Sequence, residues 1–322
     1  MNWILITDTF LHSQPFYGLG DNYSGFFNAL ISFSHRILVW PNPTELERSG
    51  RKYIAIDLLD RVAKLMGTQR PASQIILRDG AKPPKGRYVL KREFSANGGH
   101  VHIVDGISTK TWKELEGQNT SRFVWIQQDY APLLEQWGEY RIFIVGGQVW
   151  ECIMAYRNKD GLWEWHTARF GYTLERLEYG YFLAFYCIID NVVVNREMLR
   201  EDPHVPCSAI GLPIGVTQSQ IAAAQEELYS FALETLAHII RSEQVANGCE
   251  PSLALYCRMD VGIHVRSDGK LCYFVNELCR GPLATCLWTA TDVDLAHIAS
   301  NLGAEFAPIL YRWMNLRIAP RM

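Results

Sequence analysis

The sequence predicts an α+β fold in which β-hairpins alternate with amphipathic helices. Two pairs of strand-like segments, at residues 139–157 and 256–280, each enclose a glycine-containing turn. Residues 217–241 have the apolar spacing of a long helix, with Thr217 and Gln220 at its start. Hairpins and helices that alternate over residues 85–285 predict two α+β subdomains.

The composition is that of an ordinary globular protein. The chain has 322 residues, of which 48% are hydrophobic and 20% are charged, enough for two or three subdomains. The net charge of −3 favours neither a nucleic-acid partner nor a membrane surface. The eight cysteines form no CxxC pair, and no basic, apolar leader is visible. We therefore expect a cytoplasmic protein with reduced thiols.

The first sixty residues predict a short α/β unit. Residues 3–7 and 37–40 are strand-like and flank the helical spacing of Phe26, Leu30 and Phe33. Thr44 and Glu47 form a capping-box pattern, which predicts one helix towards Met66. We expect domains at residues 1–60, 61–130 and 131–322.

A lysine at the end of a strand precedes a glycine-rich loop. Residues 88–91 are strand-like, residues 95–99 are small, and alternation resumes at residues 100–104. Glycines let backbone N–H groups approach a phosphate, and Lys91 would add a positive charge. A Gly-Gly hairpin turn with a surface lysine remains the alternative.

The hairpin at residues 139–157 contains charged residues within apolar strands. Glu139 and Arg141 share one strand face, and Arg157 lies at the opposite end of the hairpin. A buried arginine requires an anionic partner, whereas an arginine on a solvated edge requires none. Both interpretations stay open for Arg141.

The hairpin at residues 256–280 is predicted to bring two carboxylates together. Alternating apolar residues end in an Asp268-Gly269 turn, so Asp260 and Glu277 should meet across an antiparallel pair. Mg²⁺ is usually held by one or two carboxylates together with phosphate oxygens. Ordinary salt bridges at a solvated strand end are the alternative. The lone His166 and His264 are interpreted as structural residues.

In their order along the chain, these motifs resemble the ATP-grasp superfamily over residues 85–285. Residues 89–91 look like its phosphate-binding lysine strand, residues 95–99 like its glycine-rich loop, and residues 126–130 like the hinge that meets adenine. The strand from Glu139 is similar to the acidic-x-Arg strand of ligases that modify peptide or protein carboxylates. The resemblance implies an ATP-grasp fold, with two α+β subdomains holding ATP between them after a short α/β unit.

The resemblance also implies site residues. ATP would contact Lys91, Ser95, Gly98, Gly99, Gln127, Gln128, Asp129 and Tyr130, and its ribose would contact Glu135 or Glu139. Mg²⁺, or Mn²⁺ in its place, would be bound by Asp260 and Glu277, with Asn276 as a further candidate. The phosphates and the acyl phosphate would face Arg141 and Arg157, and the acceptor carboxylate would face Arg280.

Two features depart from the family pattern. The family's Glu-x-Asn has a cysteine here, Cys279, in place of the asparagine. Strict alternation would place Cys279 on the face of Glu277 and Asn276 on the opposite face. The N-terminal unit is also short, and the expected second basic residue could be Lys52, Arg61 or Lys64.

The function implied is an ATP- and Mg²⁺-dependent ligase that joins a carboxylate to an amine or another nucleophile through an acyl phosphate. Its partners would be ATP and small-molecule or peptide substrates. One alternative is an ATP-grasp kinase. The other is a non-catalytic nucleotide-binding or scaffold protein, which Cys279 supports best.

Overall fold

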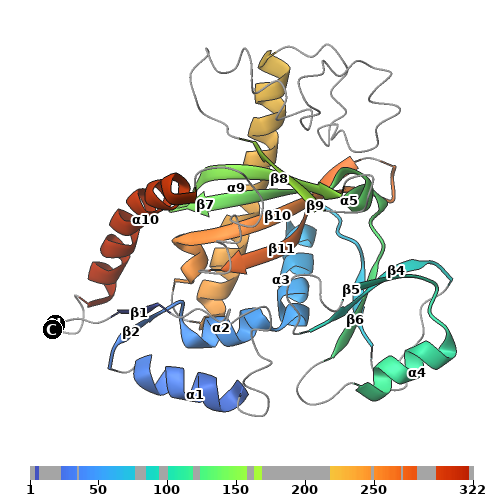
Figure 1. The fold of residues 1–322 in the computed structure, drawn as a ribbon, viewed down its shortest axis with the longest axis horizontal. Helices are drawn as coiled ribbons and strands as arrows, with labels where there is room; N and C mark the ends of the chain where they lie inside the picture. Colours follow the sequence, from blue (N-terminus) through green and yellow to red (C-terminus); the bar gives the residue numbers. More distant parts are fainter. Residues whose placement is uncertain are drawn as a thin grey trace. The chain divides into compact units, whose positions relative to one another are not determined.

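The computed structural model of the chain (Figure 1) divides into two units. Unit 1 comprises Met1–Leu65 and Arg70–Ala131, and unit 2 comprises Met66–Gln69 and Pro132–Met322. The structure describes residues 4–6, 23–34, 36–76, 85–93, 101–118, 124–157, 163–168, 218–247, 250–269, 271–280 and 295–318.

Unit 1 begins with the expected strand–helix–strand arrangement. Strands β1 (Ile4–Ile6) and β2 (Leu38–Trp40) are parallel, and α1 (Tyr23–Ser34) lies between them in sequence. Phe27 and Leu30 of α1 are buried with Leu46. Of the other residues whose spacing predicted this helix, Phe26 packs against this cluster, whereas Phe33 is exposed.

The prediction of a single helix from Thr44 to Met66 is wrong in where the helix begins and in its continuity. Asn42 is the N-cap of α2 (Pro43–Gly50), because its Oδ1 accepts a hydrogen bond from the Thr44 N–H at 2.9 Å. The chain is then extended at Arg51 before α3 (Lys52–Leu65). The Ser49-Gly50 pair, with its low helix propensity, precedes this break.

The main sheet of unit 1 is antiparallel, in the order β3-β6-β4-β5. Its strands are β3 (Ser73–Ile75), β4 (Arg87–Arg92), β5 (Val101–Asp105) and β6 (Trp125–Asp129). The helix α4 (Thr109–Gln118) contributes Trp112 and Leu115 to a core with Leu90 and Trp125.

Unit 2 is built on an antiparallel five-stranded sheet, in the order β11-β10-β7-β8-β9. The strands are β7 (Glu139–Val145), β8 (Gln148–Arg157), β9 (Trp163–Ala168), β10 (Tyr256–Val265) and β11 (Leu271–Arg280). The helices are α5 (Pro132–Trp137), α9 (Gln218–Asn247), the 3₁₀ turn η3 (Ser252–Ala254) and α10 (Leu295–Ile318).

The long helix α9 runs along one face of this sheet (Figure 1). Phe231 of α9 contacts Tyr273 of β11, with ring centroids 5.6 Å apart. The apolar residues of α9 at helical spacing, Leu228, Ala232, Leu236 and Ile239, are almost fully buried. The opposite face of the sheet is therefore the one on which polar side chains can meet a ligand.

The predicted α+β class is confirmed, although two short helices were not foreseen. Residues 109–118 form α4, and the segment around Glu135, expected to be a linker, forms α5.

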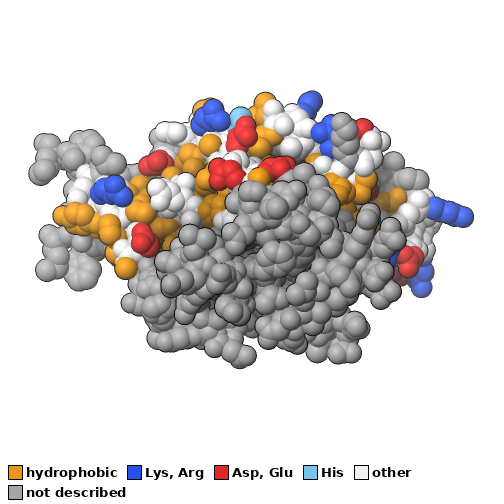
Figure 2. All heavy atoms as spheres, turned by 90° about the horizontal axis from the view of Figure 1, so that it is seen from above, with side chains coloured by type: hydrophobic (Ala, Val, Ile, Leu, Met, Phe, Trp, Pro, Cys, Tyr) orange, Lys and Arg blue, Asp and Glu red, His pale blue; other side chains and the backbone are white. Residues whose placement is uncertain are grey.

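Within the described part of the chain, no helix is long and apolar enough to cross a membrane. Acidic and basic side chains are interspersed among apolar ones on the face shown in Figure 2.

The turn between β7 and β8 provides a test of how α10 packs. Gly146 and Gly147 both have positive φ, at +57° and +77°, as the turn requires. A Cβ on Gly146 would lie 2.5 Å from Ile309 Cδ1 of α10, whereas one on Gly147 would meet no atom within 4 Å.

We expect both alanine substitutions to introduce left-handed strain of about 1–2 kcal/mol. Gly146→Ala should destabilise the protein by about 0.5–1.5 kcal/mol more than Gly147→Ala, because the terminal methyl group of Ile309 must turn away from the new Cβ. Urea denaturation of the two variants measures this difference. Equal losses would show that the Ile309 side chain does not crowd this turn.

Candidate functional site

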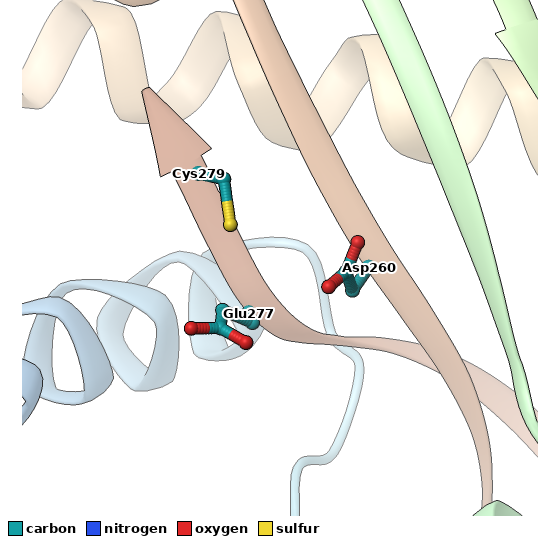
Figure 3. A group of neighbouring side chains, drawn as sticks. All are labelled: Asp260, Glu277 and Cys279. Atoms are coloured by element: carbon teal, nitrogen blue, oxygen red, sulfur yellow. The ribbon is translucent and has the colours of Figure 1, made fainter. Parts of the chain in front are cut away.

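The hairpin of β10 and β11 brings three potential ligand side chains together. Asp260 and Glu277 are paired across the two strands, and Cys279 follows two residues further along β11. One ligand atom of each, a carboxylate oxygen or the sulfur, lies within 4.8 Å of the others (Figure 3). Asp260 is buried, with 1% exposure, whereas Glu277 is exposed.

Arg258, which the sequence analysis did not select, is the central cation of this cluster. Its Nε and Nη2 donate to the two carboxylate oxygens of Asp260 at 2.7 and 2.8 Å, and Nη2 also lies 3.2 Å from the Cys279 sulfur. The side chain is almost completely buried. An arginine two residues before a strand carboxylate shares its face, and that spacing is the signal that could have identified it.

Burial and charge act in opposite directions on Asp260. The pKa of its carboxyl group is raised to about 6, because desolvation by burial outweighs the opposing effect of the Arg258 guanidinium. Among the smaller contributions to this pKa, the charge of Glu139 raises it and that of Arg141 lowers it. Asp260 is therefore a carboxylate whose negative charge depends on the cations around it.

A β-bulge brings Asn276 to the face of Glu277, so the expectation from strict alternation was wrong. Val261 pairs with Val275 and Asp260 pairs with Glu277, which leaves Asn276 as an extra residue in β11. Its Nδ2 donates to Glu139 Oε2 at 3.1 Å. Asn276 thus lies on the same side of the sheet as the carboxylates.

Strand β7 completes this side of the sheet. Arg141 is paired with Asp260, and its Nε and Nη2 donate to Glu139 Oε1 at 3.2 and 3.1 Å. The expected anionic partner of Arg141 is therefore Glu139, on its own strand. We call the polar side chains on this side the polar face; they are Glu139, Arg141, Arg258, Asp260, Asn276, Glu277 and Cys279.

Arg280 lies on the other side of the sheet, apart from the polar face. Its guanidinium forms a two-point ion pair with Glu243 of α9, with Nη1 2.8 Å from Oε2. It is buried, with 5% exposure. Since Cys279 and Arg280 are consecutive strand residues, their side chains diverge. The structure thus gives Arg280 a role in fastening α9 to the sheet.

In unit 1, the candidate adenine ligands lie on two different faces of the sheet. Gln128 pairs with Val89 of β4, and Lys91 lies two residues further along the same strand. The side chains of Gln128 and Lys91 therefore lie on the same face of the sheet. Gln127 is on the opposite face, where it accepts a hydrogen bond from Gln74 Nε2 at 2.7 Å.

The amide of Gln128 is also occupied within unit 1. Its Nε2 donates to Ser73 Oγ at 3.0 Å. Asp129 is exposed, and the Tyr130 ring lies beneath the Arg87 guanidinium at 4.3 Å. The glutamine side chains therefore bind β3 in this structure.

Some of the predicted site residues lie wholly or partly outside the part of the chain that the structure describes. Ser95, Gly98 and Gly99 lie outside the described residues, as does the side chain of Arg157, whose backbone ends β8. Glu135 is half-buried on α5. The three basic candidates, Lys52, Arg61 and Lys64, are all on α3, where exposed Arg61 pairs with Asp57 at 3.2 Å.

The donors on the polar face fit a divalent cation, although not equally well for every metal. The carboxylates of Asp260 and Glu277 are hard oxygen donors of the kind that Mg²⁺ takes together with phosphate oxygens. The thiol of Cys279 suits softer metals. The two carboxylates therefore fit Mg²⁺, and the sulfur does not.

No protein-family model and no curated protein matches this sequence. Among solved structures, the chain is similar to the D-cycloserine synthetase DcsG, with 13% identity and a TM-score of 0.49 over 92% of this chain and 86% of that one. It is also similar to the ATP-grasp ligase PsnB complexed with its minimal precursor, with 11% identity and a TM-score of 0.42 over 89% and 76%.

A D-alanine–D-alanine ligase from Bacillus anthracis is similar as well, with 13% identity and a TM-score of 0.44 over 90% of this chain and 75% of that one. These similar structures are ATP-grasp ligases, the superfamily that the sequence motifs resemble. A similarity at these sequence identities and TM-scores concerns the path of the backbone alone, and it assigns no substrate and no residue role to this protein.

Proposed function

We propose that this protein is an ATP-dependent ligase that joins a carboxylate to an amine through an acyl phosphate. The observation that supports the proposal is the polar face, where carboxylates that suit a divalent metal lie beside arginines that suit phosphate. This combination of charges matches the requirements of phosphoryl transfer, which depends on positioning and charge neutralisation more than on covalent help from the protein.

The proposed reaction has two steps. First, a carboxylate oxygen of the substrate attacks the γ-phosphorus of ATP, the bond to the β-phosphate oxygen breaks, and ADP leaves. Next, the amine nitrogen attacks the acyl carbon, phosphate leaves, and the nitrogen loses a proton. Negative charge on the transferring group and on the acyl phosphate must be offset at both stages.

Residues of the polar face would provide this charge. Arg141 and Arg258 would hold phosphate oxygens, and Glu139 would orient Arg141 through its two hydrogen bonds. Asp260 and Glu277 would hold the metal, which supplies further positive charge when it is bound. Lys91, at the end of β4, would bind a phosphate through its ammonium group.

Turnover tests the proposal directly. The protein would be incubated with ATP, Mg²⁺ and pairs of amino acids or short peptides, and ADP and phosphate would both be measured. A ligase releases both products only when the carboxylate and the amine are present together. ADP without free phosphate would instead indicate a kinase.

A non-catalytic nucleotide-binding protein is a second candidate, and one observation favours it. Cys279, in place of an oxygen ligand, is 3.2 Å from Arg258 Nη2 and leaves the site with two carboxylates. Such a protein would bind ATP and release neither ADP nor phosphate with any substrate pair. Turnover gained in Cys279→Asn would identify the lost ligand as the cause.

Replacing Lys91 tests its proposed phosphate contact. Lys91→Ala should weaken ATP binding about ten- to a hundredfold, since a charge-assisted hydrogen bond is worth about 1.5–3 kcal/mol. Isothermal titration with ATP measures the change. The matched control is Lys110→Ala, which removes an exposed lysine from α4 in the same unit. Unchanged affinity in a folded Lys91→Ala protein would remove Lys91 from the site.

A further inference from the structure

The sulfur of Cys279 lies on the polar face, and the proposed ligase function does not use it. Asp260, Glu277 and Cys279 lie on neighbouring stretches of β10 and β11 (Figure 3), with their ligand atoms within 4.8 Å of one another. Asp260 and Glu277 are a cross-strand pair, and Cys279 shares their face. The pairing of the two strands therefore sets the spacing of the three donors.

The sulfur of Cys279 lies beside the guanidinium that holds Asp260. A cysteine that binds a metal does so as a thiolate, and a neighbouring cation offsets the negative charge of that thiolate. Arg258 Nη2 is 3.2 Å from the Cys279 sulfur, and both side chains are at least nine-tenths buried. A buried charge–sulfur contact of this kind is screened less by salt than one at the surface.

A second observation at Arg258 also indicates a ligand. Its Nη1 is buried and has no hydrogen-bond partner within the described part of the chain. An unsatisfied buried donor costs about 1–3 kcal/mol, and more when the group is charged. An anionic oxygen that arrives with a metal ion would satisfy it.

We infer that the Asp260–Glu277–Cys279 cluster binds a thiophilic divalent cation of the zinc class, with the Cys279 sulfur as a ligand. The metal–sulfur bond forms as the thiol proton is released to solvent. Three anionic ligands are then balanced by the divalent ion and the Arg258 guanidinium. Mg²⁺ competes weakly, because it gains little from sulfur. The inference uses Asp260, Glu277 and Arg258, which the proposed function also uses, and it rests on that proposal in no other respect.

Co²⁺ is the probe of choice, because a cobalt–thiolate bond absorbs in the near ultraviolet by charge transfer and a cobalt–carboxylate bond does not. We expect titration of the metal-free, full-length protein with Co²⁺ to produce one saturable band. A large excess of Mg²⁺ should leave the band in place, and Zn²⁺ should abolish it. Absence of the band at saturating Co²⁺ would overturn the inference.

Two serine variants locate the sulfur. Cys279→Ser should lose the band and bind Co²⁺ at least about tenfold more weakly. Mutation of a residue that only hydrogen-bonds to a metal ligand already lowers metal affinity by about this factor, so loss of a ligand should lower it at least as much. The matched control is Cys272→Ser, on the same strand near the turn, and it should keep both band and affinity. A band that survives in Cys279→Ser, or that is lost in Cys272→Ser, would contradict the assignment.

Glu277→Gln covers the case in which Cys279→Ser fails to fold. Glu277 is exposed, so this variant should fold, bind Co²⁺ more weakly, and still show the full band at saturation. Unchanged affinity would exclude Glu277 as a ligand and overturn the three-residue site. ATP binding, measured separately with Mg²⁺, tests the proposed function: a band without ATP binding rejects that function alone, and ATP binding without a band rejects this inference alone.

Discussion

Arg258→Ala is expected to destabilise the protein by about 3–5 kcal/mol, the usual cost of removing one partner from a buried ion pair. Arg258 satisfies both carboxylate oxygens of Asp260, and both side chains are almost fully buried. Without the guanidinium, Asp260 must either remain charged while buried and without these two hydrogen bonds, or bind a proton. Each outcome costs free energy at neutral pH.

This loss should depend on pH in a defined direction. Burial already raises the folded-state pKa of Asp260 from 3.8 to about 6, so its contribution to stability is lost as pH rises from about 4 to 6. Removing Arg258 raises the folded-state pKa further and extends the loss to higher pH. The variant should therefore differ less from the wild type at pH 5 than at pH 8.

Urea denaturation at the two pH values, with chelator present, measures both effects. The control replaces Arg258 and Asp260 together with leucine, which removes both charges and should recover much of the stability. A loss under about 1 kcal/mol in Arg258→Ala, the range of an exposed pair, would contradict the buried ion pair.

Glu243→Ala is expected to produce the second large effect, a loss of about 3 kcal/mol in the free energy of unfolding. It removes the two-point partner of Arg280 and leaves a buried guanidinium between β11 and α9. The polar face lies on the other side of the sheet, so ATP affinity of the folded variant should stay unchanged.

Glu234→Ala is the matched control, because it removes an exposed glutamate from the same helix. We expect its stability to lie within about 0.5 kcal/mol of the wild type. Chemical denaturation of the two variants, followed by ATP titration, gives both measurements. If Glu243→Ala were as stable as Glu234→Ala and had lost ATP binding, Arg280 would belong with the site after all.

The hairpins were the most predictable parts of the molecule, for a local reason. Alternation across residues 261–265 and the Asp268-Gly269 turn define β10 and β11, and Gly146-Gly147 defines the turn between β7 and β8. Since the two strands of a hairpin are adjacent in sequence, their pairing follows from the turn. The juxtaposition of Asp260 and Glu277 followed from that pairing.

What escaped prediction depends on neighbours that the local pattern does not reveal. The two-residue spacing places Arg258 on the face of Asp260, but only the structure shows that both side chains are buried and hydrogen-bonded to each other. Arg280 was expected to face the acceptor carboxylate, yet its partner Glu243 is thirty-seven residues earlier in the chain. The short helix α5 had too few turns to show a period.

Because of the bulge in β11, residue 276 has no paired residue in β10, and the register of the hairpin does not depend on it. Val275 and Glu277 pair with the consecutive residues Val261 and Asp260, so deletion of Asn276 would leave both pairings intact. Deletion of a regularly paired neighbour would turn one half of the strand over and exchange its two faces. Position 276 opens onto the polar face, so the set of side chains there can change by gain or loss of a residue as well as by substitution.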